Sequence, residues 1–187
     1  MAGETTKTAS LTRVETGKMN NASVNSRKLC VRQDVHAVTT AELQLADVML
    51  FDIKIPSNAV IRAVEVFNDD LDGDASPALT LDIGLVADIK FEKVVSGVKS
   101  FVAAGAEVDI DLLVDGSTVG QAATVKWTEQ NLPAATLHAG NANKEVWQIL
   151  GYDKDPNTEF RVAVKAATAA ATAAAGDLAV AVHFLAV

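Results

Sequence analysis

Residues 46–56 read ADVMLFDIKIP, and this stretch contains the pattern that decides the fold. Its alternate apolar positions are Met49, Phe51, Ile53 and Ile55. Asp52 and Lys54 lie between them, so one face of an extended strand is apolar and the other is polar. Pro56 has no N–H to donate to a neighbouring strand, and Pro56-Ser57-Asn58 is typical of a turn. The stretch therefore predicts a half-buried strand that ends in a tight turn.

The same period of two recurs on both sides of this stretch. We expect further strands at 28–38, 60–67, 79–85, 108–112, 160–166 and 178–184, with a short one around 123–127. Turn-forming residues separate these segments, and the alternation of strands with long helices that marks nucleotide-binding α/β folds is missing. The sequence predicts an all-β fold, an antiparallel β-sandwich or jelly roll of about eight strands.

Three segments have less decisive patterns. Residues 88–101 are ambiguous and are compatible with a short helix around 89–95, and residues 145–151 fit either a strand or a helical turn. The tract 166–176, AATAAATAAAG, has high helix propensity but no amphipathic stripe that would anchor a helix. Between two strands we expect it to form a hairpin that turns near Gly176 and Asp177, with a helix as the alternative.

Length and charge divide the chain into two parts. The 187 residues suit one well-buried domain, which we assign to 28–187, whereas 1–27 are predicted to form an extended N-terminal arm. Residues 1–28 carry a net charge of +3 and the rest of the chain carries −11. The predicted interface residues are the five cations Lys7, Arg13, Lys18, Arg27 and Lys28. Such an arm suits docking onto an acidic neighbour, such as another copy of the chain, and an ordinary unstructured terminus is the alternative.

Composition argues against several classes of protein. The net charge of −8 leaves no basic footprint for nucleic acid over the body of the chain. The longest apolar region, 162–187, is interrupted by charged residues, and the first ten residues lack the apolar core of a signal peptide. Cys30 is the only cysteine, so we expect no internal disulfide, a cytosolic origin and a buried thiol. These features predict a soluble protein without nucleic-acid or membrane partners.

The sharpest polar cluster is residues 68–74, NDDLDGD. Asn68, Asp70 and Asp72 match the first, third and fifth positions of a calcium-binding loop. The position that should supply a bidentate Glu is Leu79, which begins an expected strand. These three residues are therefore a weak metal candidate, and a solvent-exposed acidic turn is the favoured interpretation. We predict no cofactor.

Catalytic chemistry has little support in the sequence. His36, His138 and His183 are far apart, and no G-x-S-x-G motif accompanies them. Residues 116–120, GSTVG, lack the lysine and the strand–helix context of a phosphate-binding loop. Two tryptophans among few aromatic residues are favoured as core or interface anchors over platforms for a sugar or a base. We predict that the chain is not an enzyme.

Three segments together resemble small virion proteins of tailed bacteriophages: VMLFDIKIP at 48–56, AVIRAVEV at 59–66 and TLDIGL at 80–85. The closing part, residues 146–184, looks like the carboxyl end of the same class, so the resemblance covers about 28–187. It implies a capsid decoration (cement) protein, made in the host cytoplasm, that binds the major capsid protein on the virion surface, commonly as a homotrimer. The alternatives are another virion component (tail tube, fibre or head–tail connector) and a carbohydrate-binding β-sandwich.

Overall fold

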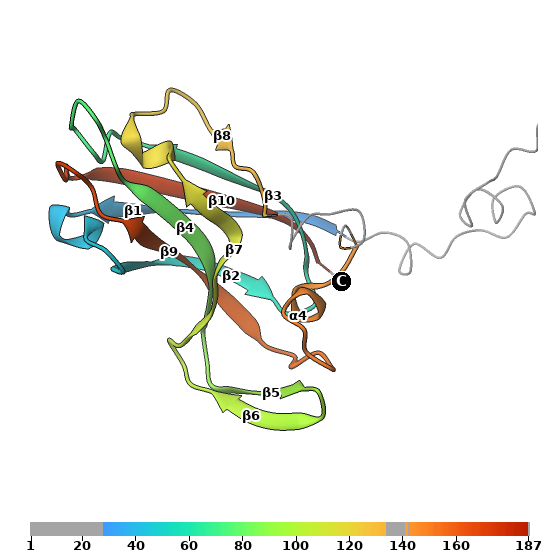
Figure 1. Cartoon of the computed structure of the whole chain (residues 1–187). Helices are drawn as coiled ribbons and strands as arrows, with labels where there is room; N and C mark the ends of the chain where they lie inside the picture. The colour runs from blue at the N-terminus through green and yellow to red at the C-terminus, as the bar shows by residue number, and fades with distance from the viewer. Residues whose placement is uncertain (1–27, 134–140, 142, 187) are drawn as a thin grey trace, which may run out of the picture.

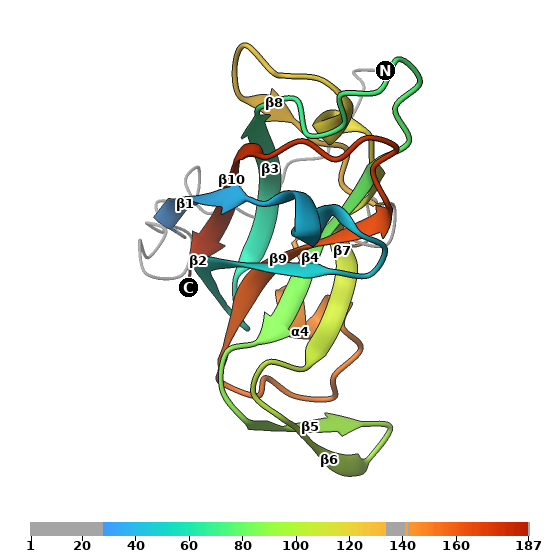
Figure 2. The ribbon, with the colours of Figure 1, turned by 90° about the vertical axis from the view of Figure 1, so that its left-hand side faces the viewer.

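Two four-stranded antiparallel sheets face each other in the structure, a computed structural model that describes residues 28–133, 141 and 143–186 (Figures 1 and 2). The first sheet has the order β1 (Lys28–Val38), β10 (Gly176–Ala186), β3 (Val60–Asn68) and β8 (Thr128–Glu129). The second has the order β2 (Val48–Pro56), β9 (Glu159–Thr168), β4 (Thr80–Ala87) and β7 (Glu107–Ser117). This architecture confirms the predicted all-β antiparallel sandwich.

The remaining elements are short. Strands β5 (Phe91–Val95) and β6 (Val98–Val102) form a separate hairpin between β4 and β7. Two 3-10 turns, η1 (Thr40–Leu43) and η2 (Val119–Gln121), and the single helical turn α4 (Val146–Ile149) complete the described secondary structure. Among the described residues, no helix has the length and apolar character needed to cross a membrane.

Strand pairing is nested once the β5–β6 hairpin is set aside. The first strand pairs with the last, β1 with β10, and moving inward β2 pairs with β9, β3 with β8 and β4 with β7. The chain consequently crosses between the two sheets at almost every connection, and only β4 and β7 follow each other within one sheet. Residues distant in sequence are thereby brought together at each end of the sandwich.

The core lies between the sheets and is built from the alternating positions of the strands. Met49, Phe51, Ile53 and Ile55 are all buried, as the pattern of 46–56 predicts. They meet buried side chains of the opposite sheet such as Val64, Val180 and Val182. Each fully buried side chain of this size contributes about 1.5–3 kcal/mol of hydrophobic stabilisation.

The edges of the two sheets meet where β1 lies beside β2, and side chains close the gap. Strand β2 departs from regular pairing with β9 between Leu50 and Lys54. Within that interval the carboxylate of Asp34 accepts a hydrogen bond from the N–H of Asp52, with Oδ2 and N 2.7 Å apart. Arg32 donates from Nη1 to the carbonyl of Lys54. Polar side chains of β1 thus satisfy backbone groups that a sheet edge would leave open.

The tract 166–176 forms neither the expected hairpin nor a helix. Its two ends belong to β9 and β10, which lie in different sheets, so residues 169–175 carry the chain from one layer to the other. The hairpin prediction is wrong because strands that pair and strands that face each other across a core have the same alternating pattern. The ambiguous segment 88–101 contains no helix and forms the hairpin strands β5 and β6. The strand predicted at 123–127 is wrong, since pairing begins only at Thr128. Residues 145–151 contain the helical turn α4, one of the two alternatives.

Candidate interaction surfaces

Asp72, from the acidic cluster 68–74, lies inside the protein and is 1% exposed. Its Oδ2 accepts hydrogen bonds from the N–H groups of Ala78 (2.7 Å), Leu79 (2.9 Å) and Ala171 (3.0 Å), and its Oδ1 accepts one from Thr172 (2.8 Å). Burial by itself would raise the pKa of this carboxyl, but the four backbone donors outweigh burial and hold the pKa well below its usual range. The ionised carboxylate therefore serves as a structural acceptor.

The other two metal candidates point elsewhere. Asn68 is buried and donates from its side-chain nitrogen to the carbonyls of Val119 (3.1 Å) and Ala122 (3.0 Å). Asp70 is exposed and accepts from the N–H of Asp72 at 3.2 Å. Within the described ranges, no three His, Cys, Asp or Glu residues are placed to share a metal ion. The expected solvent-exposed turn holds for Asp70 and is wrong for Asn68 and Asp72, because their partners come from segments far away in the sequence.

The acidic loop and the tract 169–177 are bonded to each other along their backbones. Gly73 donates to the carbonyl of Thr172 at 3.0 Å, and Ala174 donates to that of Leu71 at 3.0 Å. At the start of β10, the N–H of Asp177 donates to Oδ2 of Asp69 at 2.8 Å. The tract has small side chains here because the two segments approach closely: a Cβ on Gly176 would lie 2.7 Å from that of Asp69. The acidic loop therefore fixes the position of the segment that connects β9 in one sheet with β10 in the other.

Of the five predicted interface cations, four (Lys7, Arg13, Lys18 and Arg27) lie outside the described residues. Lys28 is exposed at the first position of β1, where it pairs with Ala186 at the end of β10. The arm of residues 1–27 also lies outside the described ranges, so its role stays a prediction.

The outer face of the first sheet carries exposed apolar side chains. On β1, the outward positions Leu29, Val31 and Val35 are each more than half exposed. Val35 is level with Ala179 of β10 and, through it, with Phe67 of β3. The Phe67 ring in turn contacts Trp127 in a tilted pair, with centroids 6.2 Å apart. Both rings are more than a third exposed, so this aromatic pair is open to a ligand or partner.

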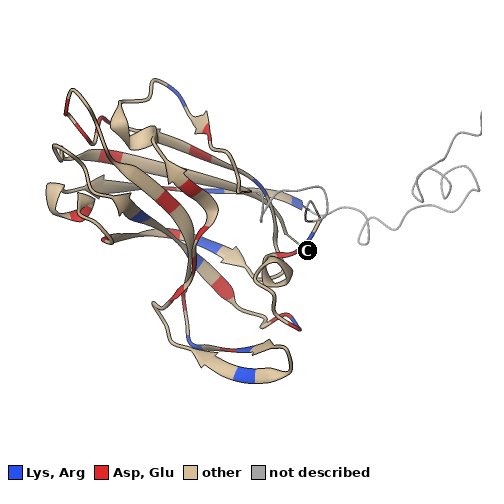
Figure 3. Ribbon diagram, viewed as in Figure 1, with Lys and Arg blue, Asp and Glu red and all other residues tan. Residues whose placement is uncertain are grey.

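A second surface, on β4 and β7, is acidic (Figure 3). Its four carboxylates are Asp82, Asp109, Asp111 and Asp115. Burial raises the pKa of Asp109 to about 6, and the neighbouring Asp111 adds to the effect. Burial also raises the pKa of Asp82, although the N–H of Gly116 donates to it at 2.8 Å. Like charges are therefore concentrated on this face.

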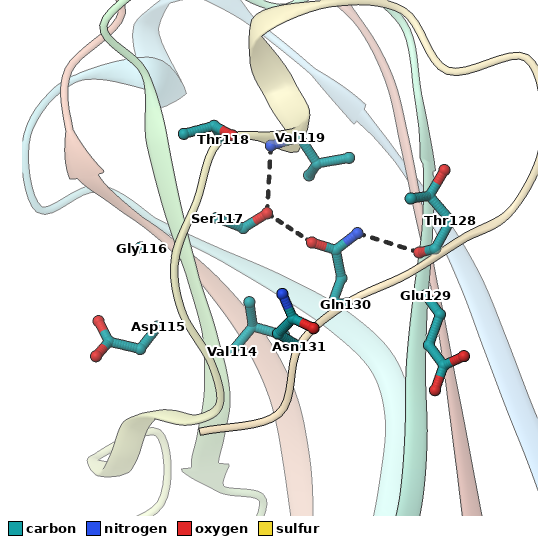
Figure 4. Close-up of a pocket in the computed structure, with 10 residues that line it drawn as sticks. All are labelled: Val114, Asp115, Gly116, Ser117, Thr118, Val119, Thr128, Glu129, Gln130 and Asn131. Atoms are coloured by element: carbon teal, nitrogen blue, oxygen red, sulfur yellow. Dashed lines mark hydrogen bonds between the residues drawn. The ribbon is translucent and has the colours of Figure 1, made fainter. Parts of the chain in front are cut away.

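The open side of the sandwich, between the edge strands β7 and β8, contains a polar cleft of about 370 Å³ (Figure 4). Ser117 donates from Oγ to Oε1 of Gln130 at 2.6 Å, and Gln130 donates from Nε2 to the carbonyl of Thr128 at 3.1 Å. The N–H of Val119 donates to the same serine oxygen at 3.2 Å. An amide cannot act as a general base toward the hydroxyl, so these contacts brace the cleft and do not activate a nucleophile.

The described histidines do not meet. His36 is 2.9 Å from Glu42, between Nε2 and Oε1, and His183 is 3.1 Å from Glu65, between Nε2 and Oε2. His36 is level with the buried Leu178 on the core side of the first sheet, whereas His183 faces outward beside Val31. The two imidazoles thus lie on opposite faces, and His138 is outside the described residues.

The remaining candidates behave as packing residues. Trp147 is half-buried against the core and donates from Nε1 to Oε2 of Glu145 at 2.7 Å. Cys30 is half-buried and also packs against the core, which is less burial than predicted.

Comparisons with known proteins identify a shared fold. No protein-family model matches the chain, and no curated protein matches it significantly. Two solved structures do. One is a chain of the cyanophage Pam1 capsid asymmetric unit, which is 22% identical with a TM-score of 0.56, over 86% of each chain. Another, from the capsid of Ralstonia phage GP4, is 18% identical with a TM-score of 0.56, over 87% of this chain and 88% of that one. The likeness extends over more than four fifths of each chain.

Proposed function

We propose that this chain is a structural protein of a tailed-phage virion that binds the outer surface of the capsid and stabilises its lattice. The observation that carries the proposal is the fold shared with chains from two phage capsid structures over more than four fifths of each chain. The sequence resemblance to small virion proteins points the same way from separate evidence, namely the strands 48–56, 59–66 and 80–85.

The arrangement of strands supports the proposal at a finer level. We infer that the sandwich, residues 28–187, is a jelly roll, because its eight main strands pair in nested order from the first with the last. Jelly rolls of eight strands are frequent in viral capsid domains. The surfaces agree with a binding role, since exposed apolar side chains on an outer sheet face normally mark a site of association.

Attachment to the shell is proposed to be multivalent. The basic arm, with Lys7, Arg13, Lys18, Arg27 and Lys28, reaches the major capsid protein or a neighbouring copy, while the sandwich contributes its own contacts. The chain is proposed to form a homo-oligomer, with a trimer favoured. Once one copy of the oligomer binds the shell, the others are held near their sites at a high effective concentration, so several weak contacts together give strong attachment. This design suits a protein that holds capsomer boundaries against internal pressure, and it requires neither catalysis nor a cofactor.

Labelling of particles tests the proposed position. Gold-labelled antibodies against the folded chain should bind to intact, DNA-filled heads in electron micrographs of the phage that encodes it. The tail serves as the internal control on the same grids. Gold particles confined to the tail or to the head–tail junction would assign the chain to another virion component, and their absence from particles would refute a virion role.

A carbohydrate-binding module is the second candidate, and the exposed pair of Phe67 and Trp127 favours it. Aromatic faces of this kind stack on sugar rings. Saturable binding to a glycan that is lost in Trp127→Ala and kept in Trp147→Phe would support this function. Absence of glycan binding by the wild-type chain would eliminate it.

A further inference from the structure

The β5–β6 hairpin projects from one end of the sandwich and is held in a defined position (Figures 1 and 2). Phe91 is its buried anchor, with ring centroids 6.3 Å from Tyr152 and 5.6 Å from Phe160. The turn is fixed by Asp153, whose Oδ2 accepts from the N–H of Gly97 at 2.7 Å. Asp153 also donates from its own N–H to the carbonyl of Val94 in β5 at 2.8 Å. These contacts hold β5 and the turn, and they leave β6 as the outer strand.

Strand β6 exposes apolar side chains on both of its faces. Val98 and Phe101 are each 67% exposed, and no residue of β6 is buried. Two-stranded hairpins are marginal in water, and exposed edges with apolar residues are surfaces that proteins normally cover. The position and composition of β6 therefore indicate a contact surface.

The hairpin differs in charge from the rest of a strongly acidic chain. Residues 89–102 contain Lys90, Lys93 and Lys99 against the single acid Glu92, while the whole chain carries −8. Lys90 lies over the ring of Phe101, with Nζ 4.8 Å from its centroid, so charge and apolar surface coincide. Lys99 is 68% exposed and forms an ion pair with Glu92, with Nζ and Oε1 3.2 Å apart. A matching partner must offer carboxylates.

The acidic face of β4 and β7 has that composition. Its carboxylates Asp109 and Asp111 lie on one side of β7, and the alternate residues Val108 and Ile110 point to the other side. Lys165 of β9 is a nearby cation, and it is already paired with Glu107 at 3.0 Å. Figure 3 shows the two surfaces on one chain, with cationic segments on the hairpin and anionic segments on β4 and β7. The complementary surfaces are therefore both present in every copy.

We propose that β6 of one copy docks against the acidic β4–β7 face of a second copy, with Lys90 and Lys99 opposite Asp111 and Asp115 and with Phe101 covered. The contact is head-to-tail, because it uses two different surfaces, and contacts of this type close into rings when the rotation permits. The inference rests on the self-association included in the proposed function and assigns the surfaces that produce it.

Charge-swap complementation in the full chain tests this contact. The hairpin variant is Lys90→Glu with Lys99→Glu, the face variant is Asp111→Lys with Asp115→Lys, and the charge-matched control is Lys126→Glu with Lys144→Glu. Sedimentation velocity should show at least a tenfold rise in the dissociation constant for each of the first two variants and no change for the control. Mixing the hairpin and face variants should restore two of the three contacts of a head-to-tail trimer and thus recover association in part. Phe101→Ser should weaken association of the wild-type chain by a similar factor. Circular dichroism checks that each variant is folded.

Three outcomes would contradict the proposed contact, and each has a different meaning. A wild-type chain that is monomeric at 100 µM would overturn both this contact and self-association, while leaving the virion position to particle labelling. Association that survives both charge reversals, or that the mixture does not restore, would overturn the contact alone. Loss of particle binding by the hairpin variant with unchanged self-association would identify the shell as the partner of β6 and equally refute the proposal.

Discussion

The carboxylate of Asp72 and the backbone N–H of Thr172 are 2.8 Å apart although 100 residues separate them in sequence. Through this hydrogen bond and three others, one buried carboxylate fixes both the loop that follows β3 and the connection that leads from β9 to β10. A cluster that resembles a calcium loop in sequence therefore holds these two segments together. We call Asp72 and its four backbone donors the clasp.

The clasp predicts a large loss of stability in Asp72→Asn. An amide retains one acceptor oxygen but presents its own N–H₂ to donors that are already buried, which should lower the free energy of unfolding by roughly 2–4 kcal/mol. Because the folded pKa of Asp72 is lowered, its contribution is present above the ordinary pKa of Asp and is lost as the pH falls below it. Urea unfolding at pH 7 measures the loss, with Asp70→Asn as the exposed control. Equal stability of the two variants would contradict the clasp.

Gly84 of β4 has no room for a side chain. A Cβ at this position would lie 2.2 Å from the backbone carbon of Ile110, where β7 passes over the strand. Gly84→Ala should therefore force the two backbones apart and cost roughly 3 kcal/mol. Gly73→Ala is the matched control, since nothing lies within 4 Å of its Cβ. Thermal unfolding compares the two, and a Gly84→Ala melting temperature equal to that of the control would refute the close approach.

Asp109 should make the protein less stable as the pH rises toward neutrality. Its pKa is raised to about 6, so the folded state binds this proton more tightly than the unfolded state, and stability falls between about pH 4 and 6. Asp109→Asn should remove this slope and add about 1 kcal/mol at pH 7, a value reduced for the solvent that still reaches the pair. Stability measured from pH 4 to 8 checks the effect against exposed Asp52→Asn. A slope that persists in Asp109→Asn would assign the titration to another group.

Asp34 should protect the edge of β2. Without its carboxylate, the N–H of Asp52 loses its acceptor, so Asp34→Ala should accelerate hydrogen exchange at that amide and cost about 1 kcal/mol. Gln33→Ala, on the opposite face of β1, is the control. Unchanged exchange at Asp52 in Asp34→Ala would mean that another group closes the edge.

Much of the fold could be predicted because strands with one buried face show it in their alternation. In residues 48–56 the pattern, the element and the buried side coincide. In residues 28–38 the strand is as predicted, but the apolar Leu29, Val31 and Val35 face outward and are exposed. The hairpin at 91–102 was missed because its strands have five residues each and mix Lys with Val. Its signal lay in Ser96-Gly97, two residues with positive φ that form the hairpin turn.

The candidate site was harder to predict than the strands. Nothing in NDDLDGD shows that the third Asp is buried, because its partners Ala171 and Thr172 lie about 100 residues further along. The exposed aromatic pair could not be predicted from the sequence either, because Phe67 and Trp127 meet only when β3 and the segment before β8 are side by side. Such contacts depend on tertiary structure, which a periodic pattern does not specify.

A cryo-electron microscopy map of the intact particle of the encoding phage is the most direct test of the central claim. The account predicts density on the outer capsid surface into which the two sheets and the projecting β5–β6 hairpin fit as one body, repeated with the symmetry of the shell. A capsid surface without that density, or the same density found in the tail, would contradict it.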